Sequence, residues 1–245
     1  MRRLLTVAAL GAALTLLILL SRAADGWHYI VTADPGTLLY AASFDEGQDD
    51  WQTYLGRLEA SVADGILRIE NGQLDSYAFS TARPYFSDFD LRLRAQAISG
   101  PLNNGYGAVF RYQSPQNFYA FLVSSDGYYS VVRIAQGSQR WLSNWIDTPV
   151  VSQGIGVENR LRVRALGDQF QFYVNDALVP LCIPDDSTAE STYVMGTCVE
   201  GALVETMRDD TLSWGQVGVV ALTFGEPDVV AGFDDVIIYS PEGDL

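Results

Sequence analysis

The sequence contains no lysine, a single histidine and only two cysteines among its 245 residues. The histidine, His28, is far along the chain from both cysteines, so a zinc site built from these residue types is unfavourable. The 15 basic residues are all arginines and are outnumbered by 30 acidic residues, which gives a formal net charge of −15. Because nucleic-acid binding requires concentrated positive charge, this balance argues against a nucleic-acid partner.

Long stretches with helical periodicity are also missing, and hairpin patterns replace them from residue 40 to the C-terminus. Asp126-Gly127 separates two runs rich in aromatic and β-branched residues, which predicts a tight hairpin. Apolar residues alternate with arginine or other polar residues in 89–97 and again in 159–165. We therefore predict an all-β chain in which two antiparallel sheets pack as a sandwich.

The N-terminus has the pattern of an export signal. Arg2 and Arg3 precede an apolar run at residues 4–20, which is long enough to reach the lower limit for spanning a membrane. Residues 1–23 are therefore expected to form either an uncleaved signal anchor or a cleaved signal peptide. The protein would then be a single-pass cell-membrane protein with its C-terminal domain extracytoplasmic, or a secreted protein.

The rest of the chain is expected to form one domain. Residues 24–39 are interpreted as a juxtamembrane connector, 40–240 as the β-sandwich and 241–245 as a C-terminal tail.

Export also explains the two cysteines. Cys182 and Cys198 bracket a polar segment, and in an oxidising compartment they are expected to form a disulfide. Closing a loop of this size would stabilise the domain by about 3 kcal/mol on the chain-entropy model. The alternative is a metal-binding cysteine pair, which lacks a nearby histidine.

Several segments occur in a fixed order along the chain: 105–111, 117–121, 159–163, 172–175, 215–219 and 233–236. Together they resemble bacterial concanavalin A-like lectin and glucanase jelly rolls, and within that group laminin-G-like and 3-keto-disaccharide-hydrolase-like modules. The resemblance implies a jelly-roll sandwich but selects no single activity, because such modules bind glycans, mediate adhesion, hydrolyse glycans or act as spacers.

No catalytic residue is predicted. The resemblance implies that a retaining glycanase would present two glutamates on one strand as Glu-x-Asp-x-Glu, because hydrolysis requires a pair of carboxyl groups. The sequence contains no such strand. The nearest acidic pairs are Asp88 with Asp90 and Asp234 with Asp235, and both are interpreted as structural.

Aromatic residues provide the main binding candidates, because aromatic rings stack on sugar rings. Trp141 and Trp145 lie beside a proline-containing loop and are expected to be exposed. Tyr119 and Tyr129 belong to the same aromatic cluster and are further ligand-binding candidates. The alternative is that many of these rings fill the core, since aromatic residues favour strands and bury large areas.

The strand arginines are expected to face away from the core, and Arg111 and Arg133 are added to the ligand-binding candidates. A stripe of guanidinium groups could bind carboxylate or sulfate groups of an acidic glycan. The alternative is a solvated outer face that is paired with nearby aspartates. The residues concerned are Arg92, Arg94, Arg111, Arg133, Arg160, Arg162 and Arg164.

An acidic turn is the one candidate metal site. Asp45 and Glu46 in this turn, with Asp234 and Asp235 from the closing strand, are calcium candidates. Calcium requires six or more oxygen ligands, and no spacing here is specific for a calcium loop, so a solvated turn is the alternative. No other cofactor is expected.

The sequence therefore predicts a non-catalytic, extracytoplasmic, membrane-anchored sandwich that binds a glycan or a surface partner. Two alternatives stay open. One is an accessory or structural subunit of a membrane protein complex, docked through the anchor and connector. The other is a glycoside hydrolase-like enzyme with an unrecognised site.

Overall fold

The computed structural model describes residues 28–45 and 50–245. Contacts define a compact unit from Val31 to Leu245. All regular secondary structure among the described residues is β-strand, and all the strand pairs are antiparallel. The predicted all-β sandwich is therefore confirmed. No helix in this part of the chain has the length and hydropathy required to cross a membrane. Residues 4–20, where the membrane segment is expected, lie outside the described residues.

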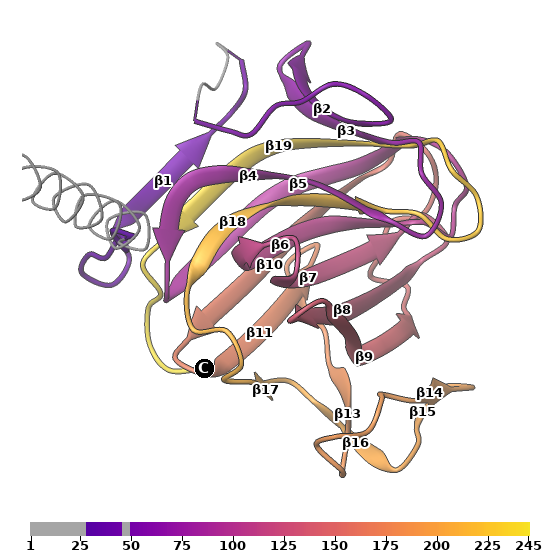
Figure 1. The fold of residues 1–245 in the computed structure, drawn as a ribbon. Helices are drawn as coiled ribbons and strands as arrows, with labels where there is room; N and C mark the ends of the chain where they lie inside the picture. The colour runs from indigo at the N-terminus through magenta and orange to yellow at the C-terminus, as the bar shows by residue number, and fades with distance from the viewer. Residues whose placement is uncertain (1–27, 46–49) are drawn as a thin grey trace, which may run out of the picture. The chain divides into compact units, whose positions relative to one another are not determined.

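The larger sheet has nine strands and is formed by segments from both ends of the compact unit (Figure 1). β1 pairs with β19 beyond the end of β3, and the short β17 pairs with β11. The main order is β12 (Ala177–Leu178), β11 (Gln169–Val174), β10 (Glu158–Leu166), β5 (Phe89–Ser99), β19 (Val229–Tyr239), β3 (Ile66–Asn71) and β2 (Leu58–Ala63), with β1 at Leu38–Ala42 and β17 at Met207–Arg208.

The smaller sheet has six strands and packs against the larger one. Its order runs from β4 (Tyr77–Phe86) through β18 (Gly215–Leu222), β6 (Gly105–Ser114), β7 (Asn117–Ser124) and β8 (Tyr128–Ala135) to β9 (Ser138–Asp147). The predicted Asp126-Gly127 turn joins β7 to β8, where Gly127 has a φ of 101° and its N–H donates to the carbonyl of Ser124. Strands distant in sequence thus become neighbours, as the pairing of β4 with β18 illustrates.

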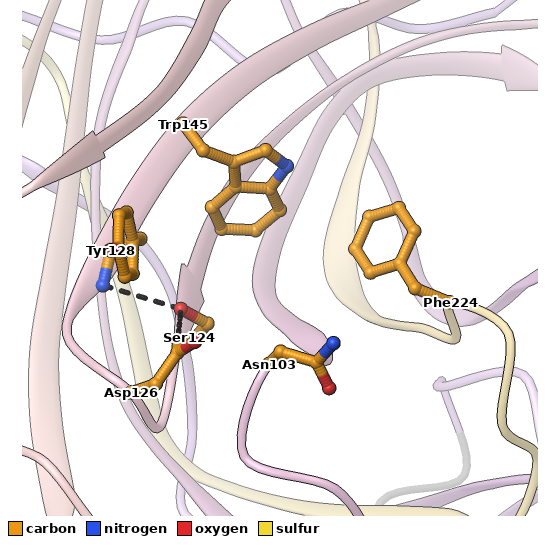
Figure 2. Close-up of a pocket in the computed structure, with 6 residues that line it drawn as sticks. All are labelled: Asn103, Ser124, Asp126, Tyr128, Trp145 and Phe224. Atoms are coloured by element: carbon orange, nitrogen blue, oxygen red, sulfur yellow. Dashed lines mark hydrogen bonds between the residues drawn. The ribbon is translucent and has the colours of Figure 1, made fainter. Parts of the chain in front are cut away.

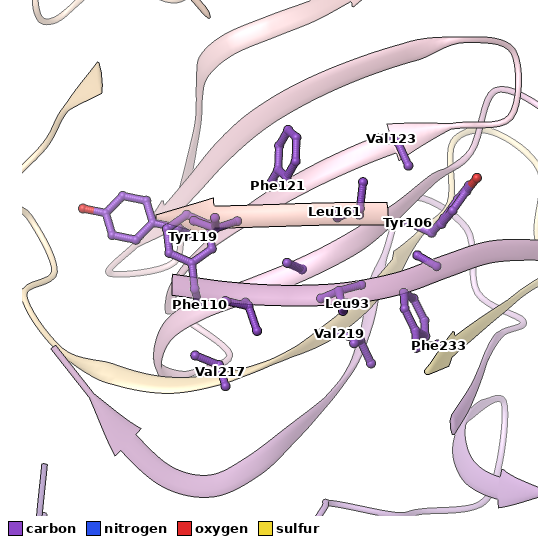
Figure 3. Packing of buried hydrophobic residues seen from close by; sticks show 14 of the residues in the cluster. Leu93, Tyr106, Phe110, Tyr119, Phe121, Val123, Leu161, Val217, Val219 and Phe233 are labelled. Carbon is purple, nitrogen blue, oxygen red and sulfur yellow. The ribbon is translucent and has the colours of Figure 1, made fainter. Parts of the chain in front are cut away.

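The core lies between the two sheets and is rich in aromatic rings. Phe110 and Phe121 from the six-stranded sheet meet Phe170 and Phe172 from the nine-stranded sheet, with ring centroids 4.9 Å apart for Phe121 and Phe172. Figure 3 shows Phe110, Phe121 and neighbouring aliphatic side chains in this layer. All four phenylalanine side chains are fully buried, so each sheet supplies one half of a continuous hydrophobic core.

The alternating strands behave as their sequences predict. In β10, Leu161 and Val163 are buried while Arg160 and Arg162 reach the outer surface of the nine-stranded sheet. A close approach between β18 and β4 depends on Gly218, where an added Cβ would lie 2.1 Å from the carbonyl oxygen of Ser80.

Residues 181–204 leave the sandwich and cover the edge strand β9. Because a disulfide joins two points of this segment, we call it the disulfide-closed excursion. It carries β13 (Leu181–Pro184) paired with β16 (Gly201–Val204) and β14 (Tyr193–Val194) paired with β15 (Thr197–Cys198) (Figure 1). The predicted disulfide between Cys182 and Cys198 is confirmed. The N–H groups of Cys182 and Asn144 donate to the hydroxyls of Ser143 and Ser191 respectively, which joins the excursion to β9. Such a cover protects the strand from edge-to-edge association.

The last part of the expected connector is hydrogen-bonded to the sandwich. The N–H of Val31 donates to the carbonyl of Tyr85 at 2.8 Å, and the N–H of Gly36 donates to that of Ser240 at 2.9 Å. In return, the N–H of Ser240 donates to the carbonyl of Thr37. These bonds fix the chain that leads into β1.

Candidate functional site

The outer face of the six-stranded sheet carries a second hydrophobic cluster, separate from the core. Its floor consists of buried side chains that include Val109, Ala120, Leu122 and Val132. Partly buried aromatic residues pack against this floor, and we call them the outer aromatic layer: Tyr77, Phe79, Trp141, Trp145 and Phe224. Because the layer covers one face while the core covers the other, β6 and β7 are buried on both faces.

Three rings of the outer aromatic layer gather at one end of the sheet. Trp145 and Phe224 meet edge to face, with centroids 5.9 Å apart and an interplanar angle of 81°. Trp141 packs against both, at 5.8 Å from Trp145 and 6.3 Å from Phe224. Edge-to-face and tilted pairs of this kind are favourable contacts between aromatic rings.

A pocket of about 320 Å³ opens beside these rings. We call it the tryptophan pocket; Figure 2 shows its six lining side chains around a common space. Trp145 and Phe224 supply apolar walls, while polar groups come from loops and strand ends at the same rim. The lining residues are Asn103, Ser124, Asp126, Tyr128, Trp145 and Phe224.

The tight hairpin between β7 and β8 positions the polar side of the pocket. The hydroxyl of Ser124 donates to one carboxylate oxygen of Asp126 and accepts a bond from the N–H of Tyr128 at 3.2 Å. The N–H of Asp126 donates to the carbonyl of Leu102 at 3.1 Å, which ties this turn to the loop that carries Asn103. The Asp126 carboxylate is thereby held at the mouth of the pocket.

A buried asparagine fixes the opposite wall. The Asn104 side-chain oxygen accepts a hydrogen bond from the N–H of Phe224 at 2.8 Å, so the loop before β6 holds the segment after β18. Of the residues that line the pocket, only Trp145 was predicted as a site residue; Asn103, Ser124, Asp126, Tyr128 and Phe224, and the supporting Asn104, were not. They belong to separate loops and strand ends, and no local sequence pattern indicates that these segments converge.

The arrangement suits a ring-shaped ligand that has both apolar faces and polar edges. The indole of Trp145 and the ring of Phe224 offer flat apolar surface, while Asp126 and Asn103 offer hydrogen-bond acceptors and donors. Apolar walls with a few placed polar groups are typical of small-molecule pockets.

Arg111 is a correction to the sequence prediction, because it points into the interior and is 1% exposed. Its guanidinium lies 4.6 Å from the ring centre of Phe170 and donates to the carbonyls of Leu212, Ser87 and Gly167. This side chain ties three loops together at one end of the sandwich and presents no surface to a ligand. Burial also lowers the pKa of Arg111.

Tyr119 and Tyr129 are also buried, so the structure corrects their predicted exposure to a ligand. The Tyr119 hydroxyl donates to Asp209 at 2.5 Å, and the Tyr129 hydroxyl donates to the carbonyl of Pro180. Burial raises the pKa of both phenols. Both rings face the core, so they stabilise the fold instead of lining a binding surface.

The arginines on the outer face of the nine-stranded sheet are paired with acidic side chains. Arg92 and Arg162 both bind Asp90 at 2.7 Å. Burial acts to raise the pKa of Asp90, but hydrogen bonds from Arg162 and Arg92 hold it below its ordinary value. Arg160 pairs with Asp176. The paired, solvated face is therefore the alternative that the structure supports.

Of the four calcium candidates, Glu46 lies outside the described residues. Arg94 binds Asp234 and Asp235 at 2.7 Å each. Burial, with the charges of Asp235 and Asp45 nearby, raises the pKa of Asp234. Among the described residues no group of three or more potential ligands gathers. The described carboxylates therefore do not make a calcium site by themselves, and calcium at this turn stays a prediction.

No protein-family model matches this chain, and no curated protein matches it. The structure is similar to the carbohydrate binding module CBM66 from Bacillus subtilis, with a TM-score of 0.53 and 18% identity over 78% of this chain and 96% of that one. It is similar to a Bacillus subtilis protein of unknown function with a galectin-like fold, with a TM-score of 0.56 and 13% identity over 85% and 98%.

A third similar structure is the GH43 protein BlXynB from Bacillus licheniformis, with a TM-score of 0.54 and 17% identity. The match covers 82% of this chain and 39% of BlXynB. Identities this low bear on the fold alone. With its two facing antiparallel sheets, the chain has the concanavalin A-like jelly-roll fold that its sequence motifs predicted.

Proposed function

We propose that this protein is a carbohydrate-binding β-sandwich and that the tryptophan pocket is its binding site. The observation that carries the proposal is the edge-to-face pair of Trp145 and Phe224 beside the Asp126 carboxylate. A sugar ring would stack its C–H face on the indole while Asp126 accepts hydrogen bonds from its hydroxyls. The carbohydrate binding module among the similar structures supports the same ligand class.

We propose further that the module is non-catalytic. Asp126 is the one carboxylic acid among the described residues that line the pocket. Glycoside hydrolysis requires two carboxyl groups about 5–10 Å apart, one of which protonates the leaving oxygen. Binding without turnover is the function that a single carboxylate supports.

The export pattern of the sequence supports an extracytoplasmic location. An anchor at residues 4–20 would place the pocket outside the cell on a membrane-attached module. Mass spectrometry of the native N-terminus tests this part of the proposal: an intact Met1 or a start within the first few residues supports the anchor, and a start near residue 24 indicates a secreted module.

The binding site can be tested by titrating the full chain with neutral oligosaccharides that score on a glycan array. Trp145→Ala should weaken binding at least tenfold, or about 1.4 kcal/mol, because a central aromatic contact is lost. Trp214→Ala is the matched control, since Trp214 packs on Tyr85 beside the opposite end of β18 and should leave affinity unchanged. Equal losses in both variants would contradict the assignment of the site.

A second assay separates binding from hydrolysis. The wild-type protein is expected to release no product from disaccharides or from the oligosaccharides that it binds. Product release that disappears in Asp126→Asn would show that the site is catalytic and would replace the binding proposal with the hydrolase alternative.

The accessory-subunit function is a second candidate, favoured by one surface. Met195 is 100% exposed in the turn between β14 and β15, and its neighbour Val194 is 51% exposed. Exposed apolar side chains on a disulfide-tied hairpin suit contact with another protein. A membrane partner that co-purifies in mild detergent and is lost in Met195→Glu would favour this function.

A further inference from the structure

A second pocket, of about 300 Å³, lies between the edge of the six-stranded sheet and the disulfide-closed excursion. Arg133 of β8 and Arg140 of β9 line one side of it, Ile183 and Pro184 of β13 line another, and the segment Met207–Thr211 completes it. We call it the arginine pocket. It lies at the opposite end of the β8–β9 pair from the tryptophan pocket, so the two sites are distinct.

The arginine pocket concentrates positive charge in an acidic protein. Three guanidinium groups and two carboxylates line it, whereas the whole chain has a net charge of −15. Arg133 and Arg140 are direct partners across the two strands, an arrangement of like charges that costs stability when nothing compensates it. The third arginine is Arg208, which pairs with Asp168 at 3.1 Å.

Internal carboxylates neutralise this charge only in part. Asp209 binds Arg133 at 2.5 Å and also accepts bonds from the Tyr119 hydroxyl and the N–H of Thr211. Burial acts to raise the pKa of Asp209, but these hydrogen bonds lower it, so the carboxylate stays ionised. The charge of Asp209 is thus already committed to contacts within the protein.

Arg140 is the incompletely partnered member. It donates to the carbonyl of Ala189 at 2.7 Å and forms no ion pair with the described residues, while the exposed Asp186 carboxylate interacts with it only at longer range. The guanidinium groups that line the pocket therefore carry more positive charge than its two carboxylates neutralise, so the pocket favours a ligand that brings negatively charged oxygens.

The remaining walls define the shape of that ligand. Leu142, Ile183, Pro184 and Met207 are apolar and face the same space as the guanidinium groups. A free inorganic anion would leave this surface unused, while a small ring that carries a carboxylate would contact both kinds of wall.

We propose that the arginine pocket binds the carboxylate of an acidic sugar, a hexuronic acid, through Arg140 and Arg133, with the sugar ring against the apolar wall. This site goes beyond the proposed function and does not rest on it, because neutral sugars would bind at the tryptophan pocket. Specificity for the acid would come from the fork-shaped guanidinium groups, which match the geometry of a carboxylate.

The test is a titration of the full chain with glucuronic acid, with glucose as the uncharged counterpart and inorganic sulfate as the free anion. Glucuronic acid should bind saturably, and Arg140→Gln should weaken it about tenfold because a charge-assisted contact is removed. Arg160→Gln is the matched control, since Arg160 is an exposed arginine on the other sheet. Trp145→Ala should leave glucuronic acid binding intact.

Four results would overturn the proposal: no saturable binding of glucuronic acid, glucose binding in Trp145→Ala that equals that of glucuronic acid, sulfate binding as tightly as glucuronic acid, or equal losses in Arg140→Gln and Arg160→Gln. If Arg140→Gln fails to fold, Arg140→Lys tests the same contact, because it keeps the positive charge but loses the fork-shaped guanidinium group. An unchanged affinity in that variant would then reject recognition of the carboxylate by the guanidinium group of Arg140.

Discussion

The two outer faces of the sandwich use the same alternating strand pattern in opposite ways. On the nine-stranded sheet, the outward positions of β5 and β10 carry arginines, and Arg92 stands directly opposite Arg162. On the six-stranded sheet, the outward positions of β7 carry Phe118, Ala120 and Leu122, which aromatic rings cover. One face is therefore charged and solvated, while the other is a second hydrophobic layer.

This difference indicates where a ligand can bind. The arginines on the outer face of the nine-stranded sheet form ion pairs within the protein. Asp90 pairs with both Arg92 and Arg162. Arg94 pairs with Asp234 and Asp235. A surface whose charges are paired internally gains little from a charged ligand. The aromatic face ends in a pocket where Trp145 borders open space, so its ring surface is available.

The largest expected effect tests whether the outer aromatic layer is a true second core. Phe118 on the outer face is 1% exposed and Phe121 on the inner face is fully buried. Phe118→Ala and Phe121→Ala should each lower the free energy of unfolding by about 3–5 kcal/mol, because each leaves a cavity. Urea unfolding measures both. A loss below about 1 kcal/mol in Phe118→Ala, the cost at a solvated site, would reject the second core.

A smaller effect is expected on the charged face. Asp90→Asn leaves Arg92 and Arg162 without their shared carboxylate, whose side chain is 6% exposed. Because the two guanidinium groups are partly solvated, the free energy of unfolding should fall by only about 2 kcal/mol. Replacing both arginines by glutamine in the same background should add little, since their partner is already gone. A further large loss would mean that the arginines act independently of Asp90.

The same carboxylate predicts a pH dependence. Its pKa lies below the ordinary value of about 4 in the folded protein, so its stabilisation is complete above that value and is lost as the pH falls through the folded-state pKa. The stability difference between wild type and Asp90→Asn should therefore be present at neutral pH and shrink at about pH 3. Urea unfolding at both pH values measures this, and a constant difference would assign the effect to packing.

Most of the fold could be predicted from short-range patterns. The alternation in β10 fixed which residues face inward, and the Asp126-Gly127 dipeptide marked the β7–β8 hairpin. These features depend on period-two geometry and turn chemistry, which are local properties of the chain. The order of the strands in each sheet was not predicted, because it depends on pairing between segments far apart in the sequence.

Burial of individual residues was harder to predict where both strand faces are apolar. Alternation places Phe118 and Tyr119 on opposite faces of β7 but does not indicate which face meets the other sheet. Tyr119 faces the core and Phe118 the outer layer. The reason is tertiary: a second hydrophobic layer covers the outside of this sheet, so hydrophobicity alone does not distinguish its two sides.

The orientation of Arg111 could not be predicted for a different reason. By alternation it shares a face with Val109, which lies in the outer cluster. The register between β6 and β7 shifts after Phe110, and Arg111 takes a φ of 47°, so its side chain turns inward and Tyr112 occupies the outer position. An irregularity of this kind re-aims one side chain without any local signal in the sequence.

The smallest expected effect on the free energy of unfolding concerns an exposed ion pair on the charged face. The side chains of Arg160 and Asp176 are 59% and 79% exposed, so their ion pair is fully accessible to water and salt. Arg160→Gln should change the free energy of unfolding by less than about 0.5 kcal/mol, because exposed pairs gain little over hydration. Thermal unfolding at low and high salt would check this. A loss above about 1 kcal/mol would show that the arginines act as one coupled network. The charged face would then stabilise the fold as the hydrophobic face does, and the two faces would no longer differ in this respect.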